Sequence, residues 1–78
     1  MKLRSVFRRI RVRKEESAYI YFILEAQEGI VAYSTLPHET GSPFRELELQ
    51  IPPDFVSEVE ELLESLQTEL GDALAILE

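Results

Sequence analysis

The clearest alternation of apolar and polar residues runs from position 44 to position 51. From position 46 onward every second residue is apolar, as in a strand with one face on a core and the other in solvent. The apolar set is Leu47, Leu49 and Ile51, and the polar set is Glu46, Glu48 and Gln50. Prolines at positions 52 and 53 cannot donate the hydrogen bonds of a sheet, so we predict a strand over 44–51.

A second alternating segment spans residues 6–13, where only Phe7 and Arg8 break the pattern. It predicts another strand. Ile10 and Val12 would face the core of the protein. The residues expected to point away from the core are Arg9, Arg11 and Arg13.

Residues 18–28 carry conflicting signals. The aromatic and β-branched run at 19–23 favours a strand. The apolar positions, however, recur at spacings of three and four residues, as they do along one face of a helix. Ser17 is available as an N-cap, and Gly29 stands where a residue with a left-handed backbone often ends a helix. We therefore predict a helix over 18–28 and keep a strand as the alternative.

The remaining elements follow from their composition. Residues 30–36 are rich in strand formers and stop at a proline, and residues 37–43 are typical of a loop. The segment after position 53 predicts an amphipathic helix, because its apolar residues form one stripe. The stripe consists of Phe55, Val59, Leu62, Leu63, Leu66 and Leu70. Gly71 would end this helix, and residues 73–78 would form a last strand or a frayed helical tail.

The order of these elements is strand, helix, strand, strand, helix, strand, within one predicted domain that covers residues 1–78. This order is typical of the ferredoxin-like α+β sandwich, in which two helices cover one face of an antiparallel sheet. The first and third strands are central neighbours in that fold. Their outward residues would then meet on the uncovered face, arginines on one strand and glutamates on the other.

Charge supports this pairing. Seven of the eight Lys and Arg residues lie in the first fourteen positions, which contain no acid, while the rest of the chain holds all 15 Asp and Glu residues. The net charge of the chain is −7. Opposite charges across two strands stabilise a sheet by only about 0.2–1 kcal/mol per pair, but rows of like charge would be costly.

Length and composition also indicate whether the chain self-associates and in which compartment it works. A chain of 78 residues buries only roughly 60% of its unfolded surface, so self-association is a reasonable source of further buried area. The absence of cysteine suits a reducing compartment. The basic start lacks the apolar run of a signal peptide, and no window reaches the roughly 18 apolar residues of a membrane span. We expect a cytoplasmic protein without a membrane segment.

Few residues of the sequence are candidates for a catalytic, metal or cofactor site. His38 is the single histidine and lies in the loop, where it has no second nitrogen or sulfur ligand for a metal. The three glycines are isolated, so no phosphate-binding loop is present. The glutamates of the second helix are expected to be solvated. We therefore expect no catalytic, metal or cofactor site, and no enzymatic activity.

Three segments carry a resemblance to ACT-like small domains found in short bacterial proteins. These segments are YFILEAQEGI at 21–30, Ser34-Thr35-Leu36, and LQIPPDF at 49–55, which leads into the acidic helix. The resemblance implies a regulatory domain that dimerises and takes a small-molecule ligand at the subunit interface. ACT domains bind amino acids with a glycine-containing turn after the first strand. The turn at 14–17 contains no glycine, which argues against amino-acid binding here.

The leading hypothesis is thus a non-enzymatic, homodimeric regulatory or protein-interaction domain with an unknown ligand. The alternative is a nucleic-acid-binding domain, because ferredoxin-like RNA-binding domains use aromatic and basic residues on the open sheet face. Phe7 and Tyr33 could take the aromatic positions. The glutamates on the same face oppose phosphate binding and disfavour this alternative. The candidate interaction face consists of Arg9, Arg11, Arg13, Glu46 and Glu48.

Overall fold

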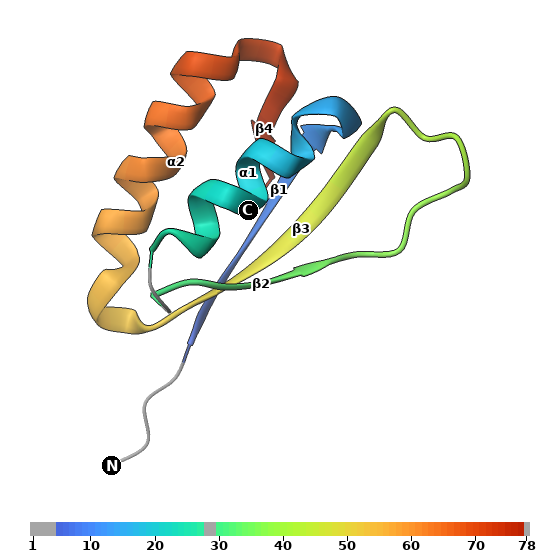
Figure 1. Ribbon diagram of the computed structural model, residues 1–78. Coiled ribbons are helices and arrows are strands. Elements are labelled where there is room, and N and C mark those ends of the chain that lie inside the picture. The colour runs from blue at the N-terminus through green and yellow to red at the C-terminus, as the bar shows by residue number, and fades with distance from the viewer. Residues whose placement is uncertain (1–4, 28–29, 78) are drawn as a thin grey trace.

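The computed structural model describes residues 5–27 and 30–77. Its helices and strands are β1 (Val6–Arg13), α1 (Ser17–Glu25), β2 (Ala32–Thr35), β3 (Phe44–Ile51), α2 (Val56–Leu70) and β4 (Leu74–Ile76). The four strands form one antiparallel sheet in the order β2-β3-β1-β4. Figure 1 shows both helices on the same side of this sheet. The protein therefore has the predicted ferredoxin-like α+β arrangement.

The two central strands have the predicted bounds, because their alternating patterns bury one face and leave the other free. β1 pairs with β3 along its whole length, from Val6 opposite Ile51 to Arg13 opposite Phe44. On β1, Ile10 and Val12 are fully buried, as predicted. A shift of one residue in this register would turn both side chains out of the core, which is why the apolar pattern specifies the pairing.

Both helices pack on the apolar face of the sheet. The α1 helix contributes Ile20 and Leu24 to the core, and α2 contributes Val59, Leu63 and Leu66. The strands contribute Ile10, Val12, Leu47, Leu49, Ile51 and Leu74. In the part of the chain that the structure describes, the opposite face of the sheet has no helix over it (Figure 1).

The first helix confirms the predicted helix over the strand alternative, but it begins differently. A 3₁₀ turn over Lys14–Glu16 leads directly into α1, so Ser17 already has helical backbone angles. Its hydroxyl donates to the carbonyl of Lys14 at 2.7 Å and does not cap the helix. The predicted N-cap is therefore wrong. The helix ends at Glu25, earlier than the predicted end at Glu28, and Glu28 and Gly29 themselves lie outside the described residues.

The later elements are shorter than predicted. β2 occupies only the middle of the predicted strand at 30–36, and Val31, just ahead of it, is buried in the core. Phe55 lies in a 3₁₀ turn ahead of α2. Gly71 ends α2 with a φ of +58°, a conformation that suits glycine. β4 confirms the last strand over a helical tail, and the predicted end at Glu78 lies outside the described residues.

Candidate functional site on the open sheet face

The uncovered face of the sheet brings the predicted charged residues together. In the register of β1 and β3, Arg9 lies opposite Glu48 and Arg11 lies opposite Glu46. Residues directly opposite each other in an antiparallel pair share a face, and both pairs have the parity opposite to that of the buried residues. Arg13 shares this face but lies opposite Phe44, which corrects the expectation that it would oppose a polar residue of β3.

These opposed charges do not form ion pairs with each other. Within residues 5–27 and 30–77, the one contact between charged side chains within 4.0 Å joins Arg8 to Glu60 elsewhere in the molecule. The expected ion pairs across the sheet are therefore absent from this part of the chain. The guanidinium groups of Arg11 and Arg13 instead lie 5.0 Å and 5.6 Å from the centre of the Phe44 ring. This is the distance range of cation–π attraction.

Phe44 is a member of the face that the sequence reasoning missed. The signal was present in the alternation that placed Glu46 and Glu48 outward, since it places Phe44 on the same side. Phe44 stands at the end of the β3 row that contains Glu46 and Glu48, and its ring contacts the guanidinium groups of two arginines of β1. The guanidinium group of Arg11 thus lies over the ring and forms no ion pair with Glu46, whereas Arg9, which has no such contact, also forms none with Glu48.

One side-chain donor of Arg9 lacks a hydrogen-bond acceptor among the described residues. Its Nε atom is shielded from solvent and has no hydrogen-bond partner in the part of the chain that the structure describes. A buried donor without an acceptor is unfavourable, so the Arg9 side chain would gain from a rotation that exposed Nε to a carboxylate.

Apolar groups lie at one end of the same surface. Phe7 lies opposite Gln50 and is 53% exposed, and Leu77, just after β4, is 39% exposed. The main-chain N–H of Leu77 donates to the carbonyl of Arg9 at 2.8 Å, which holds the chain beside β1. The open face thus combines three arginines, two glutamates and exposed apolar side chains.

Tyr33 does not belong to this face. It lies opposite the fully buried Leu49, so its side chain is on the helix side of the sheet. Its ring stacks on Tyr21 of α1 at 5.2 Å, and its hydroxyl donates to Glu25 at 2.7 Å. That hydrogen bond, with partial burial and the negative charge of Glu25, raises the pKa of Tyr33 to about 12.

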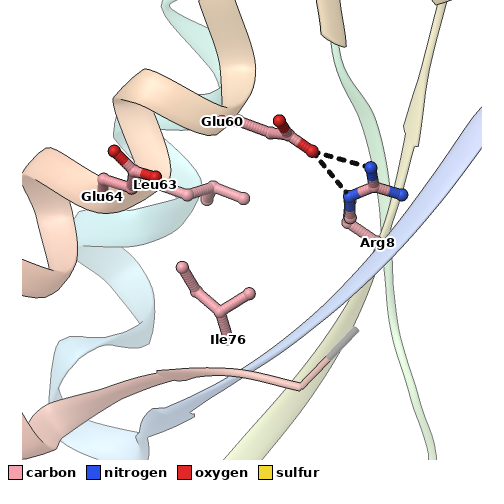
Figure 2. Close-up of a pocket in the computed structure, with 5 residues that line it drawn as sticks. All are labelled: Arg8, Glu60, Leu63, Glu64 and Ile76. Carbon is pink, nitrogen blue, oxygen red and sulfur yellow. Dashed lines mark hydrogen bonds and ion pairs between the residues drawn. The ribbon is translucent and has the colours of Figure 1, made fainter. Parts of the chain in front are cut away.

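A separate pocket of about 310 Å³ lies between α2 and the sheet, where β4 ends (Figure 2). Its lining consists of Arg8, Glu60, Leu63, Glu64 and Ile76. Arg8 donates from Nε and Nη2 to one oxygen of Glu60, at 3.1 Å and 2.7 Å. This contact explains why an arginine is tolerated on the helix side of β1, since its charge is paired at the rim of the core.

Comparison with known proteins adds one match. The family model for a domain of unknown function, DUF4911, matches residues 10–70. The chain belongs to this family. The DUF4911 match runs from the middle of β1 to the end of α2 and includes four of the five residues of the candidate face, leaving out Arg9. No curated protein and no solved structure matches the chain.

The other candidate features of this DUF4911 chain are the histidine of the loop, a metal site and a membrane-spanning helix. His38 is exposed in the loop between β2 and β3. In the described residues, no three side chains of His, Cys, Asp or Glu gather as metal ligands would. Neither described helix combines the length and the apolar character that crossing a bilayer requires.

Proposed function

We propose that the chain is a non-enzymatic regulatory or protein-interaction domain of ACT-like type, which binds its partner through the open face of the sheet. The proposal rests on the charged residues of that face, which do not form ion pairs with each other across the strands. Arg9 and Arg11 lie opposite Glu48 and Glu46 without forming ion pairs with them, and no helix among the described residues covers this face (Figure 1).

Such a surface suits a protein partner. Charges that are not already paired can form hydrogen bonds with a complementary surface, and they steer the encounter between two proteins. Phe7 and Leu77 add exposed apolar area beside the charges. An interface commonly combines apolar anchors with a polar surround in this way.

The ACT-like assignment rests on the order of the elements and on the resemblance of the sequence. It supports a cytoplasmic homodimer with a small-molecule ligand at the subunit interface. The turn after β1 is a 3₁₀ turn without glycine, so we do not extend the proposal to amino-acid binding. The fold alone gives no function, and the open face therefore carries the argument.

Nucleic-acid binding is the second candidate. Phe44 lies beside two arginines and Phe7 is 53% exposed, and a flat aromatic ring next to a guanidinium is how many proteins hold a single-stranded base. Glu46 and Glu48 lie on the same face of a chain with a net charge of −7. Phosphate binding requires a positive local potential, which these glutamates reduce.

The proposal is tested by co-purification of a tagged chain from its native cells. The bait variants are Arg11→Ser combined with Phe7→Ser on the open face, and Glu61→Ser on the exposed side of α2 as the matched control. We expect the wild type and the control to retain the same stoichiometric protein, identified by mass spectrometry, and the open-face variant to lose it. Equal retention by all three baits would contradict the proposal, and retention of nuclease-sensitive material would favour the second candidate.

A further inference from the structure

We infer that the partner of the open face is a second copy of this chain, stacked face to face so that β1 of each copy lies over β3 of the other. This inference rests on the proposed function and names the partner and its orientation. It follows from the arrangement of two rows of charge and from the symmetry of a dimer.

The rows are matched position by position. Arg9 is level with Glu48, and Arg11 is level with Glu46, along two adjacent antiparallel strands. A two-fold axis that runs parallel to the strands, between β1 and β3, exchanges the two rows and keeps each position level. Arg9 of one copy then lies over Glu48 of the other copy, and Arg11 lies over Glu46. Such an interface uses the same surface on both copies and closes as a dimer.

The other two-fold orientation is unfavourable. An axis that runs across the strands would place β1 over β1 and β3 over β3. Arginine would then face arginine and glutamate would face glutamate, with no compensating charge between the layers. Stacked sheets lie about 10 Å apart with their strands aligned within about 30°, and both axes satisfy this preference, so the charges alone distinguish the two orientations.

Two further observations suit this arrangement. Among the described residues the Nε atom of Arg9 has no acceptor, and the carboxylate of Glu48 from the second copy would lie on the open side of the same guanidinium group. Copies with a net charge of −7 repel each other, so association requires a surface on which positive groups are concentrated. Among the described residues, β1 supplies three arginines to this face, and β3 supplies two glutamates.

The test uses a variant in which the charges of the two strands are exchanged, Arg9→Glu, Arg11→Glu, Glu46→Arg and Glu48→Arg together. This variant keeps opposite charges across the strands within each copy, so it is expected to fold. In the inferred orientation the exchanged chain pairs with itself, and the wild type pairs with itself. A mixed dimer would place like charges over each other.

Sedimentation equilibrium and native mass spectrometry of the two chains, alone and mixed, measure these pairings. We expect two homodimers and at least tenfold fewer mixed dimers than random pairing gives. A preferred mixed dimer would overturn the orientation. If the exchanged chain does not fold, the pair Arg9→Glu with Glu48→Arg serves in its place.

A wild-type chain that stays monomeric at every concentration and salt would overturn the inference as a whole. The co-purification experiment tests the proposed function separately. A different protein captured only by chains with an intact open face would support the proposed function even if the wild-type chain is monomeric. Loss of both the dimer and every face-dependent partner would remove the inference and the proposed function together.

Discussion

At the scale of single residues, Tyr33 shows what alternation along the chain cannot predict. The strand β2 is only four residues long, and the sequence around it offers no polar row to indicate which side chains face outward. The side chain is on the helix side because of the pairing with β3, and its partner Glu25 comes from the last turn of α1. Neither contact follows from local periodicity, because each depends on how two separate elements meet.

This contact gives a prediction for stability at high pH. An unfolded tyrosine has a pKa of about 10, whereas the hydrogen bond to Glu25 raises the pKa of Tyr33 to about 12. The folded state holds this proton more tightly, so the contribution of the contact is fully present below pH 10 and is lost as the pH rises through 12. We expect the difference in urea midpoint between wild type and Tyr33→Phe to shrink across that window.

Urea titrations at a series of pH values measure that difference. The variant Glu25→Gln is the matched control, because it keeps the tyrosine and removes the charge that raises its pKa. A difference between wild type and Tyr33→Phe that stays constant up to pH 12 would show that the hydroxyl does not donate to Glu25 in solution.

At the scale of elements, the sequence predicts best where one pattern dominates. The bounds of β1 and β3 follow from alternation, because each strand has one buried face. The start of α1 is harder to predict from the sequence, because a 3₁₀ turn precedes it and removes the need for a side-chain cap. The five charged residues of the candidate face were found from parity alone. Their lack of ion pairs does not follow from parity, because it depends on side-chain conformations, such as that of Arg11 over the Phe44 ring.

A double-mutant cycle tests the register of these strands. Arg11 lies directly opposite Glu46, whereas Glu48 is its diagonal neighbour. We expect a coupling free energy of about 0.2–0.5 kcal/mol for charge reversal at Arg11 and Glu46, at the low end for cross-strand pairs because no ion pair forms. The coupling of Arg11 with Glu48 should be smaller. Both are measured by chemical denaturation, at concentrations low enough to keep the chains monomeric.

The order of the two couplings is the decisive result. A larger coupling for Arg11 with Glu48 would indicate a different register of β1 on β3. No coupling for either pair at low salt would mean that these charges do not sense each other within one copy.

At the scale of the whole molecule, stability depends on a small core that the two helices and one face of the sheet share. Leu63 of α2 is 2% exposed and belongs to this core, whereas Glu61 is exposed on the outer side of the same helix. Leu62, which the apolar stripe also includes, is only partly buried. The stripe on α2 therefore predicts which side faces the sheet, but the degree of burial depends on the packing of α1 beside it.

We expect Leu63→Ala to cost about 2–5 kcal/mol of unfolding free energy, a large part of the total stability of about 5–15 kcal/mol that is typical of proteins. Leu62→Ala should cost less, and Glu61→Ala should have little effect. Thermal and urea denaturation followed by circular dichroism measure the three values. Similar losses for Leu63→Ala and Glu61→Ala would show that α2 packs on the sheet through a different side.

The position of β1 in the sheet has a consequence for how the chain folds during synthesis. Its partners on β3 lie between 31 residues (Arg13 and Phe44) and 45 residues (Val6 and Ile51) further along the chain, and Ala75 follows its partner Arg11 by 64 residues. Contacts this distant in sequence form late, and they slow folding. The basic strand therefore leaves the ribosome well before the glutamates that lie opposite it. During that interval its arginines are open to any polyanion nearby, ribosomal RNA included, and the arrival of β3 ends that exposure.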